Sequence, residues 1–142
     1  MTNAAVVYRS QTGTTRRLAE AIAAHLSGRG IEARAVSIGD CDPAALGSVD
    51  LVLLGCWTSG LFVVGQHPDG PWVAFARDLP DLRHARVALF TTYKLATGSM
   101  FRRMRQELVG TGATIGLELK SRDGRLSPAQ ERQLDAWAAG AG

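Results

Sequence analysis

The chain has 142 residues, of which 46% are hydrophobic and 20% charged, and its formal net charge is +3. This length fits one domain, residues 1–142, and the composition excludes a disordered chain. Aromatic residues are not interleaved with the basic ones, so we expect no binding of nucleic acid. There is no secretory signal or apolar stretch of about 20 residues, so we expect a soluble, cytoplasmic protein with no membrane span.

Short apolar runs alternate with helical patterns from one end of the chain to the other. Most of the runs are continuous rather than alternating, as expected for strands buried on both faces of a parallel sheet. We predict strands over residues 4–8, 31–38, 51–55, 85–91 and 113–119. Between them, apolar residues spaced about four positions apart predict amphipathic helices.

The first helix carries the apolar stripe Leu18, Ile22 and Leu26. A short helical turn is expected at Asp42-Pro43, and longer helices over about 71–79 and 99–109. The last helix begins at Ser127, which forms a capping box with Gln130. Five successive β-α units predict right-handed crossovers, and hence an α/β fold: a three-layer sandwich with a five-stranded parallel sheet.

A hydroxyl-rich loop follows the first strand and leads into the first helix: Ser10-Gln11-Thr12-Gly13-Thr14-Thr15. Hydroxyl groups can donate to phosphate oxygens, a glycine permits close approach, and the amides that open a helix attract anions. An ordinary N-cap needs one hydroxyl, whereas four surround the glycine here. The Walker and dinucleotide glycine motifs are missing. The residues that follow the two cysteines do not fit a small tyrosine phosphatase. A receiver domain would need acidic residues after the first strand, where this chain has Arg9 and Ser10.

Two further loops leave strand ends at the edge where ligands bind in open α/β sheets. The loop after the third strand begins Gly55-Cys56-Trp57-Thr58-Ser59-Gly60 and runs for about 17 residues, against a usual four to six. Trp57 can either face a flat ligand or cap the core. The loop over 92–98 carries Tyr93. Its ring could stack against a flat ligand whose edge is exposed to solvent, or it could be a partly buried tyrosine at a strand end.

The spacing S-x-T-G-x-T after a first strand resembles the phosphate loop of the flavodoxin family, and the resemblance covers nearly the whole chain in its short-chain form. It implies the sheet order 2-1-3-4-5 and a non-covalently bound FMN. It implies phosphate contacts from the residues of the first loop: Ser10, Gln11, Thr12, Gly13, Thr14 and Thr15. It implies ring contacts from the second and third loops: Trp57, Thr58, Ser59, Gly60, Thr92, Tyr93, Lys94 and Gly98. The Gly60–Leu61 peptide would rotate to meet the reduced ring.

The function that this resemblance implies is electron transfer with a redox partner protein. Two alternatives stay open. One is an FMN-dependent oxidoreductase of the quinone reductase type, and the other is a flavodoxin-fold interaction or regulatory domain without flavin. Flavodoxins are typically acidic, whereas this chain is basic, and Lys94 would favour the anionic reduced ring.

The cysteines and histidines have simpler interpretations. We expect Cys41 and Cys56 to be reduced thiols, and no metal site is predicted. His25 is expected at the surface of the first helix. His67 is a candidate acid-base group in the segment 63–70, which could cover the ring edge, move as a lid or hold a partner.

Overall fold

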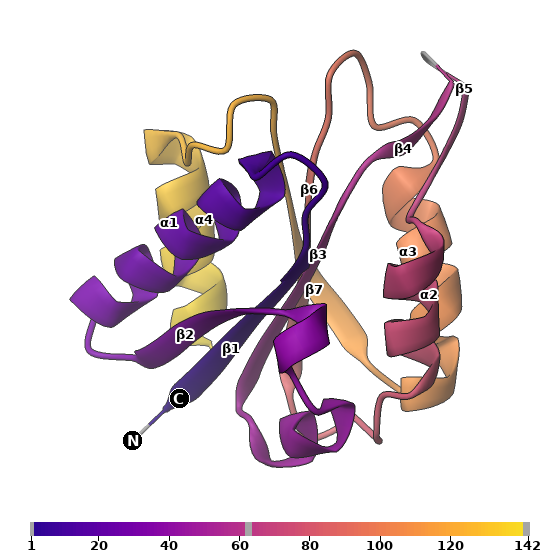
Figure 1. The fold of residues 1–142 in the computed structure, drawn as a ribbon. Coiled ribbons are helices and arrows are strands. Elements are labelled where there is room, and N and C mark those ends of the chain that lie inside the picture. The colour runs from indigo at the N-terminus through magenta and orange to yellow at the C-terminus, as the bar shows by residue number, and fades with distance from the viewer. Residues whose placement is uncertain (1, 62–63, 141–142) are drawn as a thin grey trace.

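A computed structural model describes residues 2–61 and 64–140 of the chain. Its centre is a five-stranded parallel sheet (Figure 1) with the strand order β2-β1-β3-β6-β7. Its strands are β1 (Asn3–Arg9), β2 (Glu32–Ser37), β3 (Leu51–Trp57), β6 (Arg86–Thr92) and β7 (Thr114–Ser121). Numbered by their place in the chain, these strands follow the order 2-1-3-4-5, which confirms the predicted topology.

Helices cover both faces of the sheet (Figure 1). Helices α1 (Thr14–Gly28) and α4 (Pro128–Ala139) pack on one face, and α2 (Gly70–Arg77) and α3 (Met100–Leu108) pack on the other. The crossover from β2 to β3 contains the short 3-10 turns Ile38–Asp40 and Pro43–Ser48, and a third such turn, Val109–Thr111, follows α3. The three-layer prediction is therefore confirmed, with turns in place of a helix after β2.

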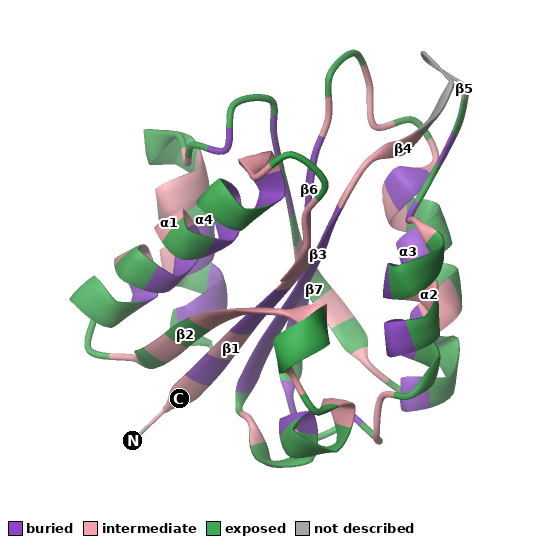
Figure 2. Ribbon diagram, viewed as in Figure 1, coloured by how far each residue is buried: buried purple, intermediate pink, exposed green. Residues whose placement is uncertain are grey.

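The core consists of two apolar layers, one on each side of the central strands (Figure 2). Residues 51–56 of β3 are buried on both faces, as the continuous pattern predicts. The predicted apolar stripe of α1 is fully buried, and so are Met100 and Met104 on α3. The edge strand β7 instead alternates between exposed and partly buried residues along much of its length, because successive side chains point to opposite faces and one face is less covered there.

The long segment after β3 is not an irregular loop. It folds into an antiparallel hairpin of β4 (Ser59–Leu61) and β5 (Val64–His67), which stands above α2 and α3 in Figure 1. The Ser99 hydroxyl donates to the Gln66 carbonyl oxygen at 2.8 Å and ties β5 to the start of α3. Gly98 has φ 49°, and a Cβ there would overlap the Gln66 side chain, so both its conformation and its packing favour glycine.

His25 lies between two helices rather than at the surface, so that expectation is wrong. Its side chain is 10% exposed, and its ring nitrogens lie 3.2 Å from a Glu131 carboxylate oxygen and 2.8 Å from one of Asp135. Arg29 also pairs with Asp135, at 3.1 Å. Because α1 and α4 cover the same face, the polar edge of one helix meets that of the other.

Candidate cofactor site

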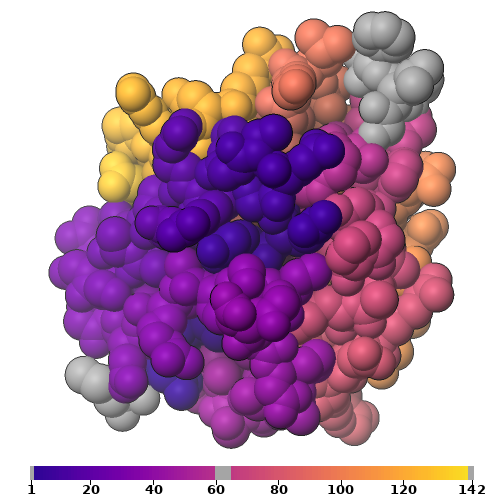
Figure 3. All heavy atoms as spheres, in the orientation of Figure 1, coloured from indigo at the N-terminus to yellow at the C-terminus, as the bar shows by residue number. Residues whose placement is uncertain are grey.

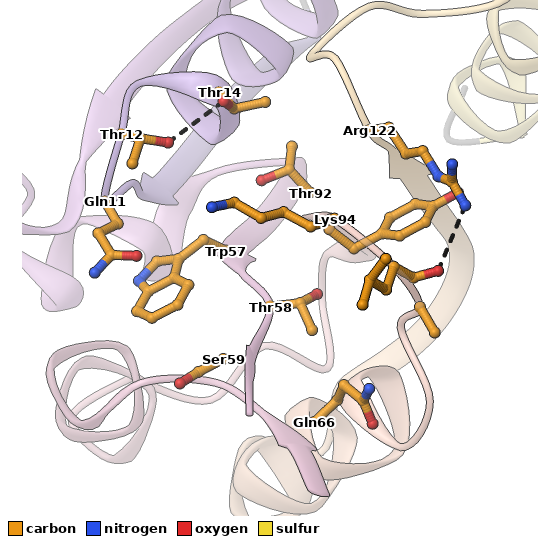
Figure 4. Close-up of a pocket in the computed structure, with 13 residues that line it drawn as sticks. Gln11, Thr12, Thr14, Trp57, Thr58, Ser59, Gln66, Thr92, Lys94 and Arg122 are labelled. Atoms are coloured by element: carbon orange, nitrogen blue, oxygen red, sulfur yellow. Dashed lines mark hydrogen bonds between the residues drawn. The ribbon is translucent and has the colours of Figure 1, made fainter. Parts of the chain in front are cut away.

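A cavity of about 590 Å³ opens at the carboxyl ends of β1, β3 and β6, a volume typical of small-molecule sites. Figure 4 shows side chains from each of these strand ends around it. It is lined by Gln11, Thr12, Thr14, Trp57, Thr58, Ser59, Gln66, Thr92, Tyr93, Lys94, Leu95, Ala96 and Arg122. Among these residues the charged side chains are the cations Lys94 and Arg122, so the cavity favours an anionic ligand.

The loop after β1 turns sharply into α1 at the edge of the cavity. Gly13 has φ 93°, a conformation that favours glycine, and its amide donates to the Ser10 hydroxyl at 3.0 Å. The hydroxyls of Thr12 and Thr14 both line the cavity and lie 3.5 Å apart (Figure 4). No described side chain caps α1, and its first turn holds no acidic residue. The opening amides of α1 are therefore suited to an anion.

Hydroxyl groups behind the cavity join the ends of three elements. Thr15 is 1% exposed, and its hydroxyl lies 2.5 Å from that of Thr92 at the end of β6. The Thr58 amide donates to the Thr92 carbonyl oxygen at 2.8 Å, and the hydroxyls of Thr58 and Thr91 lie 2.8 Å apart. These contacts fix the start of α1 and the end of β3 against β6. Thr15 thus holds the cavity wall together without lining it.

Asp69 organises one wall of the cavity. One oxygen of its carboxylate accepts hydrogen bonds of 2.8 Å from Arg9 Nε and from Trp57 Nε1, and the other accepts from the Trp72 amide at 3.3 Å, which caps α2. In Figure 3 the indigo segment that ends β1 accordingly lies against the magenta segment before α2.

The hydrogen bonds to Asp69 stabilise its ionised form. Burial alone would raise the pKa of Asp69, but the hydrogen bonds from Arg9, Trp57 and the Trp72 amide outweigh it and lower the pKa below its ordinary value. Trp57 is thus held by its polar edge to an ionised group, with its ring at the cavity. The neighbouring Cys56 is fully buried, and this burial raises the pKa of its thiol.

Tyr93 stands at the end of β6, and two cations approach its ring. The Lys120 ammonium lies 5.9 Å from the ring centroid and the Arg122 guanidinium 5.4 Å from it. Arg122 also donates to the Leu95 carbonyl oxygen at 3.5 Å (Figure 4). These are cation–π distances, so this wall is electropositive as well as aromatic.

The structure brings most of the predicted site residues to one cavity. Ser10, Gly13, Thr15 and Gly98 do not line it, although each shapes a residue or loop that does. Gly60 lies in β4, but its exposure and contacts, like the side chain of Leu61, lie outside the described residues. Sequence reasoning missed Arg122, and it did not single out Gln66, Leu95 and Ala96, although they lie in the predicted segments 63–70 and 92–98.

Comparisons with known proteins agree with this geometry. The family model described as Flavodoxin matches residues 6–137. The chain belongs to the flavodoxin family. Flavodoxins bind FMN, and the chain is accordingly an FMN-binding electron-transfer protein.

Individual relatives are similar over most of the chain. The flavodoxin of Megasphaera elsdenii is 32% identical over 111 residues, which are 78% of this chain and 79% of that protein. The solution structure of its two-electron reduced form superposes with a TM-score of 0.75 at 25% identity, over 96% of this chain and 98% of that one. A short-chain flavodoxin associated with a non-canonical PDU bacterial microcompartment shares the fold, with a TM-score of 0.77 at 20% identity, over 99% of this chain and 97% of that one.

The residues present fit FMN. A phosphate suits the uncapped start of α1 with its two hydroxyls, and the cavity contains aromatic side chains for a flat ring and no carboxylate among its described lining residues. When bound, the flavin supplies the redox chemistry, and the protein supplies position and electrostatics. None of the helices in the described part of the chain has the length and apolar character needed to traverse a lipid bilayer.

Proposed function

We propose that this chain holds FMN non-covalently in the cavity and exchanges its electrons with a separate redox partner protein. The observation that supports this most directly is the start of α1. It opens at the cavity without a side-chain cap, beside the hydroxyls of Thr12 and Thr14. A dianionic phosphate there gains the helix-end amides and two hydroxyl donors at once.

Each loop has its own part in this proposal. The loop from Ser10 to Thr15 binds the phosphate, with Thr12 and Thr14 in direct contact and Gly13 giving the backbone room. Trp57 and Tyr93 flank the ring. Further polar groups along the ring edge come from Gln11, Thr58, Ser59, Gly60, Thr92 and Lys94, while Gly98 acts through its packing on Gln66.

A comparison of two ligands tests the phosphate contacts. The double variant Thr12→Ala/Thr14→Ala loses two hydrogen bonds to a charged group, so its Kd for FMN should rise on the order of 100-fold. Riboflavin has the same ring without the phosphate, and its Kd should not change. Thr114→Ala removes an exposed threonine at the start of β7 and serves as the matched control.

The outcomes separate the possibilities. Equal losses of affinity for FMN and riboflavin in the double variant would show that the phosphate does not bind at the start of α1. A wild-type protein that takes up no FMN would refute flavin binding altogether. A pure carrier should also show little NADH- or NADPH-dependent quinone reduction without a reductase, and rapid turnover would instead favour the quinone reductase type of enzyme.

The proposal extends to location. Cys41 and Cys56 are free thiols, as expected in a reducing compartment, and we place the protein in the cytoplasm. Fractionation of cells that express the full chain tests this, and recovery with an extracellular or membrane fraction would contradict it.

A further inference from the structure

Three exposed cations lie at the mouth of the cavity, and we call them the basic rim: Lys120 and Arg122, which contact the Tyr93 ring, and Lys94, which follows Tyr93 in the chain. Lys94 and Arg122 line the cavity, and Figure 4 shows the Lys94 side chain extending across it toward the loop after β1. Lys120 lies one strand farther out, at the end of β7. The rim therefore begins inside the cavity and continues onto the outer surface.

The basic rim is not neutralised within the described residues. None of its three cations forms an ion pair there, whereas Arg9, Arg16, Arg29, Arg77, Arg83, Arg105 and Arg125 each lie beside a carboxylate. Asp123 directly follows Arg122 in the sequence, but its carboxylate accepts from the Arg125 amide at 3.0 Å and lies 3.9 Å from Arg125 Nε. Arg17 donates to the Asp123 carbonyl oxygen at 3.0 Å and adds another cation nearby.

Charges of both signs lie at the opposite edge of the sheet, where Arg83 and Arg86 accompany four aspartates. Asp42 and Asp50 precede β3, and Asp78 and Asp81 precede β6, and all four are exposed. Because parallel strands share one direction, these carboxylates lie toward the amino ends, away from the cavity. The cavity edge is electropositive because none of the three rim cations forms an ion pair among the described residues, whereas at the opposite edge Arg83 pairs with Asp81.

We propose that the basic rim docks an acidic redox protein whose own redox centre is exposed among carboxylates. The inference rests on the proposed function, because it requires FMN in the cavity. Electron transfer needs the partner to approach the cavity mouth, and the rim occupies that mouth. Opposite charges there speed the encounter and orient it, and a basic partner meets repulsion at the same place.

Small redox probes of opposite charge test the field at the mouth. Reduced FMN-loaded protein gives up two electrons and reduces two hexacyanoferrate(III) ions to hexacyanoferrate(II), or two hexaammineruthenium(III) ions to hexaammineruthenium(II), with its protons released to water. Between about 10 and 150 mM ionic strength the Debye length falls from about 30 to about 8 Å. The rate with the anionic probe should fall severalfold over this range, and the rate with the cationic probe should rise.

Matched variants assign the effect to the rim. Lys120→Gln/Arg122→Gln should flatten both dependences on ionic strength. Arg34→Gln/Arg132→Gln makes the same change in net charge at exposed positions on β2 and α4 and should keep the wild-type dependences. Equal dependences in the two variants would overturn the proposal, because net charge alone would then explain them. The FMN affinity and midpoint potential of each variant are measured alongside, so that a change in flavin binding is not mistaken for a change in encounter rate.

Protein probes test the partner itself. A reduced acidic plant-type ferredoxin gives one electron per [2Fe–2S] cluster to the bound FMN, and basic cytochrome c accepts one electron from reduced FMN. The ferredoxin rate should fall with salt and drop about tenfold in Lys120→Gln/Arg122→Gln, whereas the cytochrome c rate should rise with salt. The reverse pattern would overturn the proposal.

Two further results have distinct meanings. Cosedimentation with vesicles of anionic phospholipid that exceeds ferredoxin binding at equal ionic strength would assign the rim to a membrane surface and overturn the proposal. A protein that fails to bind FMN refutes the proposed function, whereas FMN-loaded protein with identical salt dependence for both probes refutes the docking inference alone.

Discussion

Replacement of Asp69 by alanine removes the cap of α2, the two short bonds to Arg9 and Trp57 and a longer contact of 3.6 Å from the Cys56 thiol. The cap on α2 contributes about 1 kcal/mol. The two bonds of 2.8 Å to Arg9 and Trp57 are each worth about 1.5–3 kcal/mol, less the screening of Arg9, whose side chain is 37% exposed. We expect the free energy of unfolding to fall by about 3–5 kcal/mol. Asp69→Asn keeps a cap and a neutral acceptor and should cost about 1–2 kcal/mol.

Urea denaturation followed by circular dichroism measures these losses, and Asp42→Ala is the matched control. Asp42 also caps a helical turn, by accepting from the Ala44 amide at 3.1 Å, but it is exposed and holds no indole or guanidinium group. Its loss should cost about 1 kcal/mol. The Kd for FMN should rise about tenfold in Asp69→Asn, because Trp57 is held less firmly, and stay unchanged in Asp42→Ala. If Asp69→Ala costs no more than Asp42→Ala, the bonds from Arg9 and Trp57 to Asp69 do not stabilise the fold.

Three other changes test the fold. Because the pKa of Asp69 is lowered in the folded state, its contribution to stability is complete above the ordinary pKa of about 4 and is lost as the pH falls through the folded-state pKa. Below about pH 4, the urea midpoint should therefore decline more in the wild type than in Asp69→Asn. A Cβ at Gly55 would overlap the Phe90 ring, so Gly55→Ala should lower the free energy of unfolding by about 1–3 kcal/mol, and a neutral effect in urea denaturation would contradict that packing. Ser127→Ala removes the capping box of α4 and should cost about 1 kcal/mol, which a thermal melt detects as a lower Tm.

The features that the sequence predicted correctly are those with local causes. The spacing of Leu18, Ile22 and Leu26 identifies the buried face of α1 because one face of a helix recurs every three to four residues. The capping box at Ser127 and Gln130 lies within four residues and forms as expected. The hydroxyl-rich loop after β1 was recognisable because an anion site at a helix start needs only one continuous segment.

Features that depend on distant segments were missed. Arg122 reaches the cavity because β7 lies beside β6, and Gln66 reaches it because a hairpin folds over α3, which no local pattern indicates. His25 was placed at the surface because its partners lie more than 100 residues away on α4. Asp69 carried a readable signal, since Asp-Gly-Pro fits a helix cap, but its bonds to Arg9 and Trp57 require the folded sheet.

The two aromatic walls of the cavity are held in different ways, and this difference connects cofactor binding to partner choice. Trp57 is fixed by a hydrogen bond to Asp69, whose side chain is only 12% exposed, so salt should affect it little. Tyr93 contacts Lys120 and Arg122, which are exposed and subject to screening. An acidic protein at the rim would compete with the Tyr93 ring for these same cations. We therefore expect the Tyr93 wall to respond to ionic strength and to docking, and the Trp57 wall to keep its geometry.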